Sequence, residues 1–191
     1  MRIGCIYFIL ENPLIGTAQN IERDKLITIL PTLGKEFNIS FEFFATDHPG
    51  FGHVLQFMLG ASTTFQYGDQ IPDIFYRSST STLRIYMDVN NVFFTRRDIT
   101  AAPNTWHHVQ ITQNILQTGT GYRYSIYLNG KLEHTLQNMG TGARVFNKVR
   151  VYASEYTISA GVWESPYEAQ PGQIRNLYVH SNGKCASLLF G

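Results

Sequence analysis

The segment WHHVQITQNILQTGTGYRYSIYLNGKLEHTLQN, residues 106–138, decides the fold class of this chain. Apolar residues alternate with polar ones along it, as at Tyr124, Ile126 and Leu128. A period of 2 is typical of a strand with one buried face, whereas an amphipathic helix needs a period of 3.6. The segment therefore predicts consecutive strands with turns between them.

The dipeptide Asn129-Gly130 separates two of these strands. Both residues tolerate the positive φ that a type I′ turn requires. We therefore expect Tyr124–Leu128 to pair antiparallel with Leu132–Leu136 in a hairpin.

Short strand-like runs, separated by turn signals, continue through the rest of the chain. Pro31 is expected to end the run that begins at Asp24, and Asn90-Asn91 to form a turn. With no convincing helix, repeat or linker, these runs predict an all-β fold, a two-sheet antiparallel jelly-roll sandwich. The expected strands outside the opening segment are Asp24–Leu30, Phe37–Phe44, His53–Leu59, Asp73–Arg77, Thr82–Asp88, Val92–Thr95, Val145–Ala153 and Gln173–Val179.

Length and composition fit one domain over residues 1–191. The chain has 191 residues and is 14% aromatic but only 15% charged, which is typical of a folded β protein. A net charge of +1 provides no basic face for phosphate contacts, so nucleic acid is not an expected partner. No run approaches the roughly 20 apolar residues that span a bilayer, so no membrane insertion is expected.

The first residues allow two interpretations. Met1-Arg2 followed by Ile3–Leu10 resembles a short signal-peptide core, but Glu11 and Pro13 soon interrupt the apolar run. We favour the alternative that Ile3–Leu10 is the first strand of the sandwich.

Two further features bear on a secreted origin. Cys5 and Cys185 lie near opposite ends of the chain. They could form a disulfide that contributes about 4 kcal/mol or more in the loop-entropy model, or remain two unpaired thiols. Asn38-Ile39-Ser40 is an N-glycosylation sequon, which makes Asn38 a candidate glycosylation site and favours an extracellular, secreted protein.

Several motifs occur in a family-specific order. They are Trp106-His107-His108-Val109, then Tyr127-Leu128-Asn129-Gly130, then the segment from Gly172 to Val179, with Phe37–Phe44 upstream. This order resembles laminin G-like domains and the wider concanavalin A-like lectin-glucanase superfamily, which includes pentraxins and the thrombospondin N-terminal module. The resemblance implies the jelly-roll architecture and leaves the function open, because one fold hosts many activities.

No catalytic constellation accompanies the resemblance. Glycoside hydrolases of this superfamily carry Glu-X-Asp-X-X-Glu on one strand, which places two carboxyl groups around a glycosidic bond. That pattern is absent, and Glu155, Glu164 and Glu168 do not share one strand face. His107-His108 cannot chelate one ion, because adjacent strand residues point to opposite faces. We therefore predict that the protein is not an enzyme.

Calcium is the one cofactor that the resemblance suggests, because laminin G-like domains often hold an ion at the sandwich rim. Oxygen ligands from separate loops would have to converge there. The candidates are Asp47, Asp69 and Asp73, with Asn90 and Glu168 as more distant additions. The alternative is that these residues only form turns and contact solvent.

Two loop regions are candidate ligand-binding surfaces. Residues 154–172 supply Tyr156, Trp163 and Tyr167 beside Glu168, and sugar sites usually combine aromatic rings with a few fixed polar groups. The alternative is that Trp163 folds back onto the core. The second candidate patch consists of Tyr67, Asp69 and Arg77.

The predicted function is that of a non-enzymatic extracellular recognition module. It would bind a glycan or a matrix or cell-surface protein through loops at the sandwich rim. The alternative is a structural adhesion or matrix module that self-associates as a homo-oligomer and takes no small ligand. Arg96-Arg97 could pair with acidic ligands, or could simply be a solvated strand end.

Overall fold

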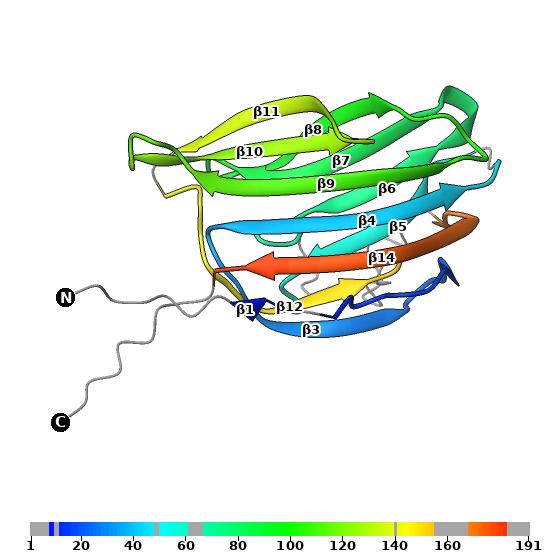
Figure 1. Ribbon diagram of the computed structural model, residues 1–191, viewed down its shortest axis with the longest axis horizontal. Helices are drawn as coiled ribbons and strands as arrows, with labels where there is room; N and C mark the ends of the chain where they lie inside the picture. The colour runs from blue at the N-terminus through cyan, green and yellow to red at the C-terminus, as the bar shows by residue number, and fades with distance from the viewer. Residues whose placement is uncertain are drawn as a thin grey trace, which may run out of the picture.

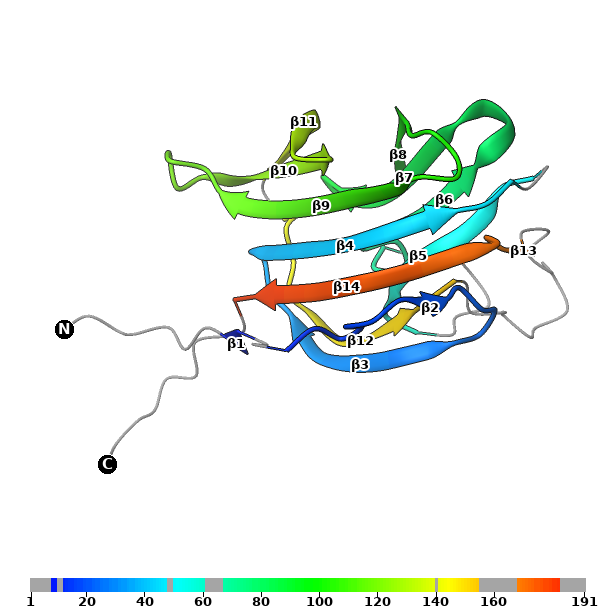
Figure 2. The ribbon, with the colours of Figure 1, turned by 45° about the vertical axis from the view of Figure 1, so that its right-hand side comes forward.

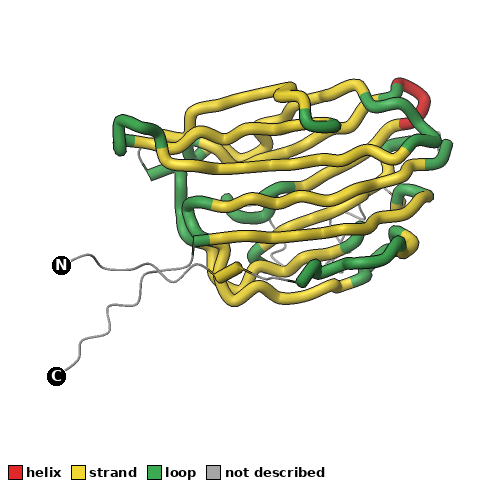
Figure 3. The backbone as a smooth tube through the Cα atoms, viewed as in Figure 1, coloured by secondary structure: helices red, strands yellow, loops and turns green. Residues whose placement is uncertain are grey.

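The computed structural model describes residues 8–9, 12–47, 50–60, 67–139, 141–154 and 168–182, and for residues 8, 9, 93 and 168 it describes the backbone alone. The described part is built from strands β1 to β14 and one 3₁₀ turn, η1 (Ser78–Thr80), as Figure 3 shows. Within this part no helix is long and apolar enough to cross a membrane. The all-β prediction is confirmed.

The first sheet has the strand order β1-β14-β4-β9-β10-β11, with β2 beside β14, and it forms the front layer in Figure 1. Every pair in this sheet is antiparallel. Its strands are β1 (Phe8–Ile9), β2 (Gln19–Asn20), β4 (Phe37–Ala45), β9 (Trp106–Ile115), β10 (Gly121–Leu128), β11 (Lys131–Met139) and β14 (Gly172–Ser181).

The second sheet has the order β3-β12-β5-β6-β7-β8 and lies behind the first. The two layers are also distinct in the turned view of Figure 2, so the predicted sandwich is confirmed. Strand β13 pairs with β5 in parallel, and the other pairs are antiparallel. Its strands are β3 (Leu26–Leu33), β5 (Gly52–Met58), β6 (Asp73–Arg77), β7 (Thr82–Val89), β8 (Val92–Thr100), β12 (Phe146–Tyr152) and β13 (Glu168–Ala169).

The core lies between the sheets and follows the alternation in the sequence. On β4 the side chains of Phe37, Ile39, Phe41 and Phe43 are buried, and the residues between them are only half-buried. The period of 2 in this segment thus coincides with its buried face. The second sheet contributes the facing layer, which includes Val54, Leu55, Phe57, Ile74, Tyr76, Leu83, Ile85, Met87, Val149 and Val151.

The Asn-Gly hairpin forms as predicted. Asn129 and Gly130 have φ values of 52° and 80°, and Tyr124 lies opposite Leu136. The register shifts between Ile126 and Tyr127, where a bulge interrupts the ladder. The Asn129 side chain also accepts a 2.9 Å hydrogen bond from the backbone of β9, which ties the turn to that strand.

Two strands are longer than the sequence predicted. Strand β3 continues past Pro31 to Leu33, because it lies at the sheet edge, pairs only with β12, and so tolerates a missing N–H. Strand β8 continues from Val92 to Thr100 rather than ending at Thr95, because β7 pairs with it along nearly its whole length.

The predicted first strand is described only at its end. Phe8 and Ile9 form β1 and lie opposite Ser181 and His180 of β14. Cys5 and Cys185 lie outside the described residues, so their pairing stays a prediction.

Candidate functional site

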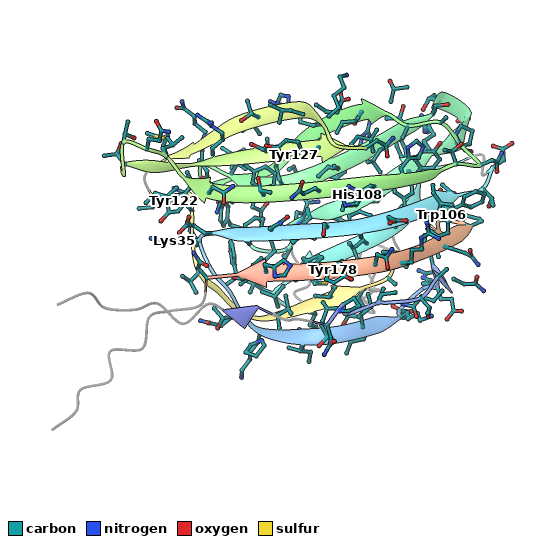
Figure 4. The ribbon with its side chains drawn as sticks, in the orientation of Figure 1. Lys35, Trp106, His108, Tyr122, Tyr127 and Tyr178 are labelled. Atoms are coloured by element: carbon teal, nitrogen blue, oxygen red, sulfur yellow. The ribbon has the colours of Figure 1, made fainter. Side chains whose placement is uncertain are left out.

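Among the described side chains, those of Phe44, Trp106, Tyr127 and Tyr178 are aromatic and partly exposed on the outward face of the first sheet, and we call them the aromatic face. Figure 4 shows Trp106, Tyr127 and Tyr178 on this side of the sheet, together with His108. The Phe44 and Trp106 rings are in contact, with their centroids 5.7 Å apart. These rings therefore lie on the open surface of the sheet and are not part of the sandwich core.

Strand register places two of these rings on either side of a polar floor. Tyr178 lies opposite Ser40, Ser40 opposite Gln110, and Gln110 opposite Tyr127. The two tyrosines are therefore three strand spacings apart, about 14 Å. The Gln110 amide donates a 3.1 Å hydrogen bond to Asn38, whereas the Ser40 hydroxyl makes no hydrogen bond within the described part of the chain. The floor has polar groups left over for a ligand.

Beside this floor, an ion pair fixes the ring of Trp106. The Arg175 guanidinium lies 4.0 Å from the centre of the Trp106 ring and contacts Glu42 at 2.6 Å and 2.7 Å. Asn176 donates a further 3.0 Å hydrogen bond to the same carboxylate. The hydrogen bond from Asn176, followed by the hydrogen bond and charge of Arg175, lowers the pKa of Glu42. The carboxylate therefore stays ionised near neutral pH and holds Arg175 against the indole.

The two adjacent histidines of β9 point to opposite faces, as predicted. His107 is buried, with Nε2 2.7 Å from the Ala102 carbonyl and Nδ1 3.1 Å from the amide nitrogen of Asn129. His108 is exposed on the side of the aromatic face. His107 is thus part of the core, and only His108 is open to a ligand.

The predicted calcium ligands do not converge. Asp47 follows β4 and accepts a 2.7 Å hydrogen bond from the Ser78 hydroxyl, whereas Asp69 and Asp73 are buried. In the described ranges no group of three or more His, Cys, Asp or Glu side chains is arranged to hold a metal ion. The charges of Asp69 and Asp73 both act on Asp88, whereas Asp47 is hydrogen-bonded to Ser78 beyond the end of β6. The described residues thus do not bring the three aspartates together, and calcium binding stays a prediction.

The predicted patch of Tyr67, Asp69 and Arg77 is not one surface either. The Tyr67 hydroxyl donates a 3.0 Å hydrogen bond to the Asp88 carbonyl near the end of β7, and Asp69 is buried. Arg77 lies opposite Thr82 at the start of β7. Six strand residues, about 20 Å, separate Thr82 from Asp88. Tyr67 and Arg77 therefore lie at opposite ends of the sheet.

The remaining candidate residues lie wholly or partly outside the described residues, or carry a modification that stays a prediction. Tyr156, Trp163 and Tyr167 lie outside the described residues, as does the side chain of Glu168, whose backbone begins β13. Asn38 lies on the outward side of β4, and its glycosylation stays a prediction.

The outward face of the second sheet also carries polar groups, but they are buried. His53 and Asp73 are each 2% exposed, and the His53 Nδ1 atom lies 3.4 Å from Asp73. The His53 ring packs on Phe75, with a centroid distance of 3.7 Å. This pair is therefore not part of the exposed surface of the second sheet.

Sequence reasoning missed the aromatic face, although part of the signal was present. Trp106 is out of phase with the buried residues Val109 and Ile111 on the same strand, so alternation alone places it outside.

The fold can be compared with known proteins. No family model matches the chain, and no curated protein sequence matches it either. Solved structures do match. A native heptameric SAP-like pentraxin from Limulus polyphemus is 21% identical, with 87% of this chain and 73% of that chain covered and a TM-score of 0.52.

Botulinum neurotoxin domains match as well. The receptor binding domain of botulinum neurotoxin D is 13% identical, with 94% of this chain and 50% of that chain covered and a TM-score of 0.55. The serotype D ligand binding domain in complex with N-acetylneuraminic acid is 11% identical, with 96% and 44% covered and a TM-score of 0.52. The chain spans half or less of these toxin chains.

These likenesses concern the fold. At such identities they show a shared architecture and carry no residue roles. The chain has the concanavalin A-like lectin/glucanase fold, as its motifs predicted. Structures with this fold include a pentraxin and a toxin domain solved with a bound sugar.

Proposed function

We propose that this chain is a non-enzymatic, extracellular recognition module that binds a short oligosaccharide along the aromatic face. The observation that carries the proposal is the arrangement of Tyr127 and Tyr178 on either side of the Ser40 and Gln110 floor. Sugar rings pack their apolar faces on aromatic side chains while their hydroxyls bind fixed polar groups. The face supplies both.

The length and flatness of the face favour a chain of sugars over a single one. The two tyrosines are about 14 Å apart, which exceeds the width of one pyranose ring. Trp106 extends the apolar surface along the strands, and its ring is already fixed by Arg175, so little side-chain entropy is lost when a ligand stacks there. The site is thus largely formed before binding.

The comparisons support this proposal at the level of the fold. One matched toxin domain is described as a complex with N-acetylneuraminic acid. That finding belongs to the toxin chain, of which this chain matches 44%.

A glycan array followed by calorimetry with the best ligand tests the proposal. We expect Tyr178→Ala and Tyr127→Ala each to weaken binding about tenfold or more, since each removes a large apolar contact. Phe94→Ala is the matched control, because Phe94 is an aromatic residue 42% exposed on β8 of the other sheet. Absence of binding to any sugar, or equal binding by the tyrosine variants, would contradict the proposal.

The same variants separate sugar binding from self-association. If the aromatic face joined two copies of the chain, light scattering would show an oligomer that Tyr178→Ala converts to a monomer. A wild-type monomer that binds sugar supports the recognition module. A wild-type oligomer without sugar affinity supports a structural module instead.

A further inference from the structure

The two sheets leave a groove along one side of the sandwich, where each sheet ends. Strands β8 and β11 are the last strands of the second and first sheets, and they run near each other at the top of Figure 1. The space between them has a volume of about 370 Å³ and is called the edge groove here. It is lined by Arg97, Asp98, Ile99, Thr100, Lys131, Glu133 and His134.

Two basic side chains point into this groove from opposite sheets. Arg97 lies opposite the buried Ile85, and His134 lies opposite the buried Ile126, so both share the inner side of their strands. The Arg97 Nε atom donates a hydrogen bond to the Nε2 atom of His134. Because an arginine keeps its protons, His134 accepts this bond and its ring is neutral.

The positive charge of Arg97 is not balanced locally. Asp98 is held by Arg84 through two 2.8 Å hydrogen bonds, and Glu133 is held by Lys131 at 2.9 Å. Among the described residues no carboxylate lies within ion-pair distance of Arg97, whose Nη1 atom donates to a backbone carbonyl at 2.7 Å. Among the described residues, the Arg97 guanidinium thus has no carboxylate partner, and a bound anion would offset its charge.

We infer that the edge groove is a binding site for a hydroxylated carboxylic acid of monosaccharide size, such as a uronic acid. A guanidinium binds a carboxylate through two parallel hydrogen bonds, which favours this planar anion. Glu133, which is already paired with Lys131, also lines the groove, and its carboxylate can accept a hydrogen bond from a ligand hydroxyl. The groove volume of about 370 Å³ is near the lower end of the range that small-molecule sites have.

This site is separate from the aromatic face. Arg97 and His134 lie on the inner side of their strands, whereas Tyr127 and Tyr178 lie on the outward side of the first sheet. The inference therefore stands whether or not the proposed oligosaccharide binds. Tyr178→Ala is expected to leave the edge groove unchanged, so failure of one site can be told from failure of the other.

Nuclear magnetic resonance of the full chain with sodium glucuronate tests the inference, and glucose serves as the neutral match. We expect a saturable shift of the His134 ring signals with glucuronate and none with glucose. Burial, and then the charge of Arg97, lowers the pKa of His134. A carboxylate bound to Arg97 offsets that charge, so the pKa of His134 rises when glucuronate is bound.

Charge variants identify the residue responsible. Arg97→Gln is expected to weaken glucuronate binding at least about tenfold, because it removes a charge-assisted pair. Arg96→Gln removes the same charge from the outward side of β8 and is expected to change affinity less than about twofold. If Arg97→Gln fails to fold by circular dichroism, Arg97→Lys keeps the charge without the planar fork and is expected to bind several-fold more weakly.

Three results would overturn the inference. Glucose could shift the same signals, sulfate could bind as tightly as glucuronate, or Arg96→Gln could weaken binding as much as Arg97→Gln. Binding of glucose would show that the ligand needs no charge. Equal binding of sulfate would show that the site does not prefer a carboxylate. An equal effect of Arg96→Gln would show that the ligand does not bind in the groove.

Discussion

The aspartate at the end of β7 is expected to make stability depend on pH. Asp88 is buried, and one of its carboxylate oxygens accepts a hydrogen bond from the backbone of Gly68. Burial raises the pKa of Asp88 to about 7, the negative charges of Asp69 and Asp73 add to the rise, and backbone hydrogen bonds from Gly68 and Gln70 oppose it. The folded chain therefore keeps a proton that the unfolded chain releases.

The size of the effect follows from that difference. The ordinary pKa of the group is 3.8, so the folded state binds the extra proton between about pH 4 and pH 7. The contribution of Asp88 to stability is then fully present below pH 4 and is lost as pH rises through this window, by up to about 4 kcal/mol at 1.36 kcal/mol per pKa unit. Asp88→Asn removes the titration and keeps an acceptor for Gly68. The variant should gain stability over the wild type as pH rises.

Urea unfolding followed by circular dichroism between pH 4 and pH 8 measures the stability of the wild type and of Asp88→Asn. Asp98→Asn is the matched control, because the hydrogen bond and charge of Arg84 lower the pKa of Asp98 and the group stays ionised throughout the window above pH 5. Its stability difference from the wild type should be constant there. If the difference between Asp88→Asn and the wild type also varied by less than about 1 kcal/mol from pH 5 to pH 8, the argument from burial would be refuted.

Three further predictions concern the first sheet. Gly172→Ala should destabilise the fold by roughly 2–4 kcal/mol in thermal unfolding, because a Cβ there would lie 2.0 Å from the Phe44 carbonyl oxygen; an unchanged melting temperature would contradict this. Glu42→Gln should change stability by no more than about 1 kcal/mol yet alter Trp106 fluorescence, since the guanidinium over the indole loses its ionic partner. A glycan on Asn38 would cover the polar floor, so mass spectrometry of secreted protein should find Asn38 unmodified in any preparation that binds oligosaccharide.

The sequence predicted the parts of the fold that depend on local pattern. Period 2 identified the inner face of β4 correctly, and Asn129-Gly130 gave the hairpin because only a few residues adopt its positive φ without strain. Strand ends were less accurate. The continuation of β3 past Pro31 depends on the strand being at a sheet edge, which is a tertiary fact.

The candidate sites were harder to predict, because they are assembled by strand register across the sheet. Tyr127 and Tyr178 are far apart in sequence and share a surface only through β4 and β9. Arg97 and His134 are hydrogen-bonded because they lie on edge strands of the two sheets, on the same side of the sandwich. Alternation shows which residues share a side of one strand, but it does not show which strands become neighbours.

A bulge in β14 shows how completely the aromatic face depends on register. Arg175 and Tyr178 are three residues apart, so strict alternation would place them on opposite sides of the sheet. Both lie outward because the ladder shifts between them, where Asn176 has a φ of 52°. Asparagine adopts this conformation more readily than most residues, and its side chain also binds Glu42. One residue thus turns Tyr178 outward and helps to fix the ion pair beside Trp106, which makes the bulge part of the proposed site.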